Sequence, residues 1–291
     1  MTNRFTTGEL VQTACIWEAT ARKVGNVHRY ADFDQTNYLD FILSAAAIAP
    51  YFNDPDLPVG HMILEAVQST SSMVGQNTNL GIVLLMAPLC AVSKTGPLQT
   101  GLKHVLSGLS QRDANLVFKA IRLANPGGLG DAQEQDVRNE PTVTLLEAMK
   151  LAADRDFIAR QYANAFEDIF NFCLPVFLES SECFGSVEAA IIDLQMRIMA
   201  QYPDSLIARK NGQAIAEGVR IKADQIMKLG GIATPEGRRA GVRLDTYLRN
   251  QGNRLNPGTT ADLIAACLFT ALRENKVMPS AHFRWQVEDW L

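Results

Sequence analysis

Apolar side chains recur along most of the chain at intervals of three and four residues, the period of an α-helix. Between Leu10 and Ala21 they fall on one face, and Thr6 and Glu9 in front of them match a capping box. The same spacing predicts further helices over Phe41–Ala49, Pro58–Ser69, Asn79–Val92, Asn115–Ala124, Thr142–Ala153, Arg155–Phe170, Ser186–Gln201, Gln213–Leu229, Thr234–Asn250 and Pro257–Arg273. No sustained alternation of apolar and polar residues lies between hairpin turns, so no strand is predicted. We therefore expect an all-α fold.

Breaks in this pattern separate the predicted helices at residues 51–57, 125–140, 230–234 and 250–256. None has the composition of an interdomain linker, so residues 1–291 are predicted to form a single compact multi-helix domain. The longest break, 125–140, begins with Asn125-Pro126-Gly127-Gly128 and continues with acidic residues. A loop of that length inside a helical protein is typical of a functional or mobile segment.

Composition narrows the class of protein. Of 291 residues, 27 are Lys or Arg and 31 are Asp or Glu, so the net charge is −4 and no basic stripe for nucleic acid is expected. The most apolar segment, Leu80–Val92, is too short to cross a membrane, and Met1–Leu10 lack the pattern of a secretory signal. Five cysteines without a Cys-x-x-Cys pair predict reduced thiols and a cytoplasmic location, and four scattered histidines do not predict a zinc site.

The segment 253–266, NRLNPGTTADLIAA, is the most distinctive candidate site. Asn256 is placed to cap a helix whose first turn holds Pro257. Unpaired backbone N–H groups at a helix start bind phosphate, and they would come from Gly258, Thr259 and Thr260. Asp262 follows about one turn later, in position for a magnesium ion or a substrate hydroxyl. A capped core helix with incidental threonines would carry the same sequence.

The segment 22–34, RKVGNVHRYADFD, is a second candidate, in which cations precede two carboxylates. Its candidate ligands for a polyphosphate are Lys23, Asn26, His28 and Arg29. Asp32 and Asp34 are candidates for the magnesium ion that accompanies a polyphosphate. The alternative is a helix end, with its cations placed favourably against the dipole, followed by a polar loop.

Two shorter segments add polar groups beside predicted helix ends. The segment 75–81, GQNTNLG, contains three polar residues, Asn77, Thr78 and Asn79. Any one of them suffices to cap the next helix, whereas the three together fit contacts with a purine or ribose. In 204–212, DSLIARKNG, Asp204 is predicted to cap a short helix that ends with Arg209 and Lys210. These two cations suit a phosphate, although a charged helix end is the commoner outcome.

Charged residues also cluster between positions 154 and 168. Asp154, Arg155, Asp156 and Arg160 precede Glu167 and Asp168 on the same predicted helix. This spacing favours an internal ion-pair ladder over a metal site. No serine or thiol has an adjacent base in a recognisable spacing, so a covalent nucleophile is not predicted.

Five of these segments, in this order, resemble the triphosphoribosyl-dephospho-CoA synthase family. They are Lys23-Val24-Gly25, Asn77-Thr78, Gly127-Gly128, Asp204-Ser205-Leu206-Ile207-Ala208-Arg209, and Asn256-Pro257-Gly258-Thr259-Thr260-Ala261-Asp262-Leu263. Three positions depart from the family pattern: Val24 replaces a proline, Asn79-Leu80 replace His-Lys, and Ala31-Asp32-Phe33-Asp34 replace a glycine- and histidine-containing segment. The chain therefore resembles a divergent branch, closer to the archaeal and methylotroph-type members.

The resemblance implies an enzyme that transfers the triphosphoribosyl group of ATP to the 2′-hydroxyl of dephospho-CoA or a related acceptor, with release of adenine. The product would be a prosthetic-group precursor of acyl carrier proteins, and Mg²⁺ would accompany ATP. The implied phosphate ligands are Lys23, Arg29, Arg209, Lys210 and the Gly258–Thr260 amides, while Asn77 and Asn79 would contact the base or ribose. Asp32, Asp34 and Asp262 would divide metal binding and base catalysis, with Asp34 and Asp262 as the catalytic candidates.

Three other interpretations stay open from the sequence. The chain could be a magnesium-dependent N-glycoside hydrolase of a nucleotide, a non-catalytic nucleotide-binding protein, or a phosphoribosyl-type transferase of a different cofactor pathway. In each of them the partners are small molecules rather than nucleic acid or membrane. A homodimer is also left open.

Overall fold

The computed structural model describes residues 5–54, 56–127, 134–288 and 290–291. This part of the chain forms fourteen α-helices: α1 (Thr7–Thr20), α2 (Tyr38–Ile48), α3 (Val59–Val74), α4 (Leu80–Cys90), α5 (Leu98–Ser107), α6 (Gln111–Ala124), α7 (Leu145–Ala152), α8 (Phe157–Ala163), α9 (Leu174–Phe184), α10 (Val187–Gln201), α11 (Ser205–Asn211), α12 (Gln213–Lys228), α13 (Pro235–Arg249) and α14 (Gly258–Arg273). Short helical turns lie at η1 (Ala49–Phe52), η2 (Ile169–Cys173) and η3 (Gly231–Ala233), and β1 (Asn250–Asn253) is a four-residue strand. The expected all-α fold is confirmed.

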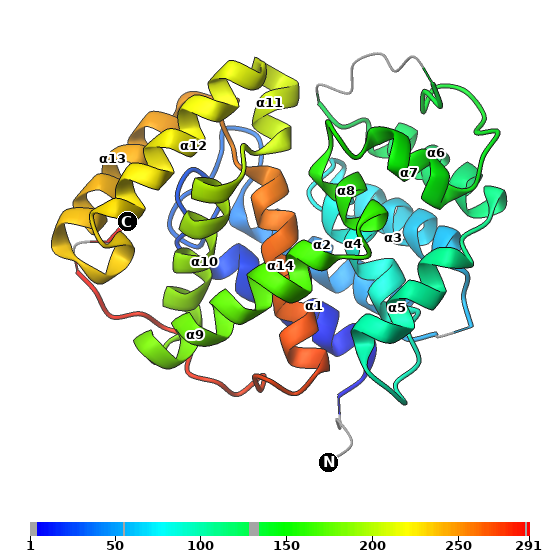
Figure 1. The fold of residues 1–291 in the computed structure, drawn as a ribbon, viewed down its shortest axis with the longest axis horizontal. Coiled ribbons are helices and arrows are strands. Elements are labelled where there is room, and N and C mark those ends of the chain that lie inside the picture. The colour runs from blue at the N-terminus through cyan, green and yellow to red at the C-terminus, as the bar shows by residue number, and fades with distance from the viewer. Residues whose placement is uncertain (1–4, 55, 128–133, 289) are drawn as a thin grey trace.

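Helix α14 forms the centre of the molecule. It packs against α1, α4 and α10, and its residues from Leu263 to Leu272 are all buried. A helix that is apolar on all sides requires neighbours all round it. Figure 1 shows these neighbours, with α9–α13 on one side of α14 and α3–α8 on the other. Within the described residues, no helix has the length and apolar character needed to span a bilayer.

Buried apolar side chains form two clusters that share α10. Ile191 and Leu194 of α10 belong to the larger cluster, with α1 to α9 and α14, while Ile192 and Met196 belong to the smaller one, with α12 and α13. The two faces of α10 therefore join the halves of the protein. That residues 1–291 form one domain stays a prediction.

Several helix starts follow the predicted capping chemistry. Thr6 and Glu9 form the expected capping box of α1, and the Thr234 side chain caps α13. Two further boxes begin α2 and α6 ahead of their apolar residues, at Asn37–Asp40 and Ser110–Asp113. Polar first turns precede the apolar face, so the spacing alone places these two starts too late.

Other details of the secondary structure differ from the prediction. The helix predicted over Arg155–Phe170 is broken, because Ala165 and Phe166 adopt left-handed φ angles of 53° and 61°. Helices α5 and α9 were not predicted, nor was the short strand β1. At α14 the N-cap is Pro257, without a side-chain cap, rather than Asn256.

Candidate functional site

A cavity of about 1260 Å³ opens where several helix ends meet. Its walls come from the starts of α4, α11 and α14, from α8, and from residues 33–36, 125–127 and 134–137. In Figure 1, α11 lies at the upper edge of the molecule and α8 lies lower and to its right, and residues of both line the cavity. Typical small-molecule pockets measure about 300–1,000 Å³, so this cavity has room for more than one small molecule.

Asp262 supplies a carboxylate to this cavity. It is half-buried on the first turns of α14, and the structure gives it no hydrogen bond or ion pair within the described residues. Burial raises the pKa of Asp262 well above its ordinary value, and the nearby carboxylates of Glu18 and Asp204 raise it further. An unpartnered carboxylate with a raised pKa is suited to accept or donate a proton near neutral pH.

Glu18, on α1, also lines the cavity and is paired behind it with Lys23. The Lys23 ammonium lies 3.0 Å from Glu18 Oε1 and donates to the carbonyl oxygens of Glu18, Ala21 and Val27. Burial raises the pKa of Glu18, and burial lowers the pKa of Lys23. Because Lys23 is fully buried and does not line the cavity, its predicted phosphate contact is corrected to an internal ion pair.

Amide side chains line another part of the cavity wall. Asn26 and Asn79 are buried there, and within the described residues each has an Nδ2 donor without a hydrogen-bond partner. Buried donors are almost always paired, so these two point to an acceptor on a ligand. The neighbouring Asn77 accepts from the Leu80 N–H at 3.1 Å, and Thr78 bonds with Ser44 at 2.6 Å.

Cations form a third group in the cavity: Arg155, Arg160, Arg209 and Lys210. Arg209 donates to Asp156 at 3.0 Å, while its buried Nε has no partner within the described residues. Lys210 has no ion pair in that part of the chain, and burial lowers its pKa, helped by Arg209. Among the described residues six carboxylates line the same cavity, so it is a site of mixed charge. Lys210 and the unpartnered Nε of Arg209 are groups there that are free to bind an anion.

Two buried or half-buried carboxylates hold these cavity elements together. Asp204 caps α11 through Oδ1, as predicted, while its Oδ2 accepts the Thr260 N–H and the Thr260 hydroxyl, both at 2.8 Å. Asp156 caps α8 through Oδ1, and its Oδ2 binds Arg209. Ser205 adds a bond of 3.0 Å to Thr259. Helices α8, α11 and α14 are therefore tied to one another at the cavity.

This arrangement changes the predicted role of the α14 start. The N–H and hydroxyl of Thr260 are both occupied by Asp204, and the Gly258 N–H donates to the Asn256 carbonyl at 2.9 Å. Neither amide is therefore free for a phosphate, contrary to the expectation. Asn256, Gly258 and Thr259 do line the cavity, and Asn256 Oδ1 is buried without a partner within the described residues.

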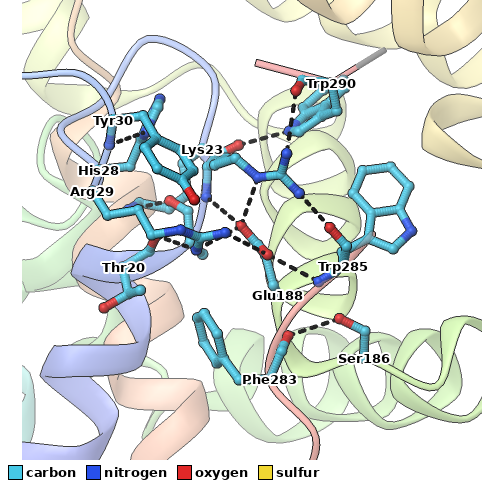
Figure 2. A network of polar contacts seen from close by, with 12 residues as sticks. Thr20, Lys23, His28, Arg29, Tyr30, Ser186, Glu188, Phe283, Trp285 and Trp290 are labelled. Atoms are coloured by element: carbon cyan, nitrogen blue, oxygen red, sulfur yellow. Dashed lines mark hydrogen bonds and ion pairs between the residues drawn. The ribbon is translucent and has the colours of Figure 1, made fainter. Parts of the chain in front are cut away.

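The basic cluster of 22–34 is used inside the protein instead. Figure 2 shows Glu188, on α10, at the centre of contacts from Arg29 and from the Trp285 backbone, and Arg22 also pairs with it at 2.8 Å. Burial, followed by the neighbouring cations, lowers the pKa of His28 to about 3, so this imidazole is neutral. Neither Arg29 nor His28 lines the cavity, so the structure does not bring them together with the other candidates, and their phosphate contacts stay predictions.

The predicted metal trio is not assembled. Asp32 and Asp34 are exposed and do not line the cavity, and Asp32 accepts the Tyr38 N–H at 2.7 Å. Across the described ranges, no group of three or more His, Cys, Asp or Glu side chains is placed to hold a metal ion. Gly128 of the predicted Gly-Gly loop lies outside the described residues.

The cavity thus collects most of the candidates from the three later segments. Of the predicted site residues, those that line it are Asn26, Asn77, Thr78, Asn79, Arg209, Lys210, Asn256, Gly258, Thr259 and Asp262. Sequence reasoning missed Glu18. The predicted ion-pair ladder does form one pair, between Arg160 and Asp168. Arg155, Asp156 and Arg160 of that ladder also line the cavity. Glu18 carries a usable signal, since it lies one helical turn after Ala14 of the apolar stripe.

The family model described as ATP:dephospho-CoA triphosphoribosyl transferase matches residues 4–280. The chain belongs to this family. The resemblance found in the sequence is therefore confirmed across nearly the whole chain.

Individual relatives and a solved structure agree with this assignment. A probable 2-(5''-triphosphoribosyl)-3'-dephosphocoenzyme-A synthase of Pseudomonas savastanoi is 34% identical over 113 residues, 38% of each chain. One of Vibrio cholerae is 25% identical over 248 residues, 78% of this chain and 74% of the relative. The crystal structure of a putative triphosphoribosyl-dephospho-CoA synthase from Archaeoglobus fulgidus superposes with a TM-score of 0.62 at 26% identity, over 79% of this chain and 97% of that one. The match to the Pseudomonas savastanoi relative spans 38% of that relative's length.

Proposed function

We propose that this chain transfers the triphosphoribosyl group of ATP to the 2′-hydroxyl of dephospho-CoA, or of a related acceptor, and releases adenine. Family membership supports the reaction class. The observation that carries the proposal is that the unpartnered carboxylate of Asp262 lies in the same cavity as four cations and two unpartnered amides. These are the groups that a polyphosphorylated nucleoside and a hydroxyl nucleophile require.

The reaction exchanges one bond at C1′ of the ATP ribose for another. The bond from C1′ to the adenine nitrogen breaks as the acceptor oxygen bonds to C1′. The hydroxyl proton passes to Asp262, and adenine leaves with the bonding electrons and takes up a proton from water. Asp262 then releases its proton to water, so that no net proton is gained or lost. Positive charge develops at C1′ on the way, and the carboxylates of Asp262 and Glu18 on the cavity wall stabilise it. No covalent enzyme nucleophile is required.

The other cavity residues bind the two substrates. Arg209 and Lys210, with Arg155 and Arg160, hold phosphates, while Asn26 and Asn79 donate to acceptors on the base or ribose. Mg²⁺ enters with ATP, held by phosphate oxygens and water. This ion commonly keeps most of its ligands from phosphates and water and takes only one or two carboxylates from the protein. Chelation of Mg²⁺ is therefore expected to abolish turnover.

The test is to incubate the protein with ATP and Mg²⁺, with and without dephospho-CoA, and to measure adenine and the coupled product by mass spectrometry. We expect adenine only when the acceptor is present. Equal release without it would indicate a hydrolase, and ATP binding without any release would indicate a non-catalytic protein. Either result would overturn the proposal.

Two carboxylate variants make the test specific to the site. Asp262→Asn is expected to lower kcat by about 10²–10⁴-fold, the usual contribution of a positioned base, and to leave ATP affinity within about threefold. Asp34→Asn is the matched control, because that carboxylate is exposed and outside the cavity, and it should leave kcat unchanged. Full activity in Asp262→Asn would contradict the assigned role.

A cytoplasmic location and a homodimer stay predictions. All five cysteines are unpaired, and four of them are buried, which suits a reducing compartment. Light scattering on the purified protein tests the oligomeric state.

A further inference from the structure

A buried carboxylate outside the cavity supports one of its cations from behind. Asp168 is only 7% exposed and accepts four hydrogen bonds. Its Oδ1 accepts from Arg160 Nη2 at 3.0 Å and Tyr202 Oη at 3.1 Å. Its Oδ2 accepts from Gln161 and Asn164, both at 2.8 Å. Arg160 and Tyr202 line the cavity, and Asp168 does not.

The backbone is strained where it brings Asp168 to this position. Ala165 and Phe166 both have left-handed φ angles, 53° and 61°, and the π-helical turn η2 follows at Ile169–Cys173. Two successive non-glycine residues in this region are costly, so the surroundings must compensate. The Phe166 side chain is fully buried, with its ring 5.8 Å from that of Tyr162. Strained and π-helical backbone of this kind is frequent beside functional sites.

Arg160 is fixed in three ways and still has donors to spare. Its guanidinium lies over the rings of Phe157, at 4.8 Å, and Tyr202, at 5.0 Å, while Asp168 holds Nη2. Its Nε and Nη1 have no hydrogen bond within the described residues, and its side chain is 39% exposed. An arginine held in this way loses little freedom when it binds a phosphate.

We propose that Arg160 is a ligand of the substrate's phosphate chain and that Asp168 is the positioning residue that holds it ready. This inference rests on the proposed function for the presence of a phosphate chain in the cavity. It goes further in assigning a role to Asp168, which lies outside the cavity and which none of the five motif segments includes. A purely structural Asp168 would stabilise the fold without affecting anion affinity.

The chain contains a matched control for that alternative. Asp193 is 3% exposed and binds Arg197 at 2.8 Å and Ser180 at 2.7 Å. Arg197 is 39% exposed, as Arg160 is. Neither Asp193 nor Arg197 lines the cavity. Asp193→Asn therefore removes a similar buried charge from a similar pair at a distance from the site.

The experiment measures the affinity of inorganic tripolyphosphate by calorimetry, with thermal unfolding of each variant recorded alongside. Asp168→Asn keeps the side-chain shape and removes the charge, and we expect it to weaken binding about tenfold. Arg160→Gln should weaken binding at least as much, and the double variant should be no weaker than Arg160→Gln alone. Asp193→Asn should lose comparable thermal stability and keep its affinity within twofold.

Additive losses in the double variant would overturn the inference, as would an equal loss in Asp193→Asn or unchanged affinity in Asp168→Asn. If Asp168→Asn fails to fold, Tyr202→Phe replaces it, because it removes one bond to Asp168 and keeps the ring over Arg160. We then expect a two- to threefold loss, and no loss would overturn the inference. This experiment measures binding and not turnover. A protein that binds tripolyphosphate as expected but releases no adenine would therefore refute the proposed function and leave this inference standing.

Discussion

The Asp262 carboxylate occupies the space that a side chain at position 81 would need. A Cβ added to Gly81 would overlap the Asp262 carboxylate and lie 3.0 Å from its Oδ1. Gly81 belongs to the first turn of α4, and Asp262 to the first turns of α14. The missing side chain therefore lets two helix starts approach closely enough to place the carboxylate on the cavity wall.

Gly81→Ala is expected to displace this carboxylate and to reduce kcat about 100-fold, because a shift of about 1 Å at a reacting group has effects of that size. Gly218→Ala, on α12, is the control: a Cβ there meets nothing within 4 Å. It should leave kcat unchanged and stabilise the helix by about 0.5–1 kcal/mol. Steady-state kinetics and urea unfolding measure both effects. Normal kcat in Gly81→Ala would show that the carboxylate position is unimportant.

The raised pKa of Asp262 also predicts a cost in stability. Because the folded protein holds this proton more tightly than the unfolded chain, stability falls as pH rises from the unfolded pKa, about 3.9, through the folded value. Asp262→Asn removes that penalty and should raise Tm by at least about 2 °C near pH 8. The gain should vanish near pH 4, below which both states are protonated. Calorimetry over this pH range measures it, and a constant difference would contradict the assignment.

The cavity residues next to helix ends could be predicted from the sequence, because their chemistry is local. Asn77, Arg209 and Asp262 lie beside caps or turns that the sequence itself marks. The basic cluster could not be interpreted in this way. Arg22 turns inward because its partner is Glu188, which lies 166 positions further along the chain. Nothing local distinguishes such an arginine from a phosphate ligand.

One carboxylate, that of Asp204, bonds to the starts of both α11 and α14, the helices on two sides of the cavity. Asp204 accepts from Leu206 and Ile207 at the start of α11 and from Thr260 at the start of α14. Burial raises the pKa of Asp204 although these donors favour its charge. The positions of Lys210 and Asp262 relative to each other therefore depend on this bridge.

Thr260→Val tests the bridge by removing the hydroxyl that donates to Asp204 at 2.8 Å. We expect a loss of about 1–3 kcal/mol in unfolding free energy, since a buried acceptor loses a charge-assisted bond. A several-fold fall in kcat should accompany it. Thr246→Val is the control, because the exposed Thr246 hydroxyl donates only to the Val242 carbonyl within α13. Its removal should change the unfolding free energy by less than about 0.5 kcal/mol. Equal losses in the two variants, measured by urea unfolding, would refute the bridge.

For the helices, the sequence predicted which of them exist better than it predicted where each begins and ends. Apolar spacing located most helices, whereas the break after α8 depends on the left-handed residues Ala165 and Phe166, neither of which is a usual helix breaker. The Phe166 ring is fully buried at that break, so the position depends on tertiary packing that the local sequence does not reveal. Helix α5 was missed although Leu98, Leu102 and Leu106 are spaced by four, because Pro97 and Gly101 interrupt the pattern.

The chain as a whole is closed by a network around Glu188 (Figure 2). Arg22 and Arg29 follow α1, Glu188 belongs to α10, and Trp285 and Trp290 belong to the C-terminal segment. Arg22 donates to the carbonyl oxygens of both tryptophans, and the Trp290 indole donates to the Arg22 carbonyl at 2.9 Å. Segments from both ends of the chain are thus attached to the helix that the two apolar clusters share.

Glu188→Gln would leave the buried Arg22 and the half-buried Arg29 without their counter-charge, which costs about 3–5 kcal/mol of unfolding free energy. Burial opposes the charge of Glu188, but hydrogen bonds from Arg29 and Arg22 outweigh it and lower its pKa. Its stabilising contribution is therefore present above the ordinary glutamate pKa of about 4.3 and is lost as pH falls through the lowered value. The difference between wild type and variant should shrink in acid.

Tryptophan emission can follow this change, because Trp285 and Trp290 touch the network and the ring of Trp17 lies 6.3 Å from that of Phe283 in the C-terminal segment. In Glu188→Gln we expect red-shifted emission at lower urea than in the wild type, with unchanged kcat per folded molecule because Glu188 does not line the cavity. Glu217→Gln, which removes the partner of Arg220 on α12, should change neither measurement. A Glu188→Gln variant with wild-type urea stability would mean that the network does not hold the ends of the chain together.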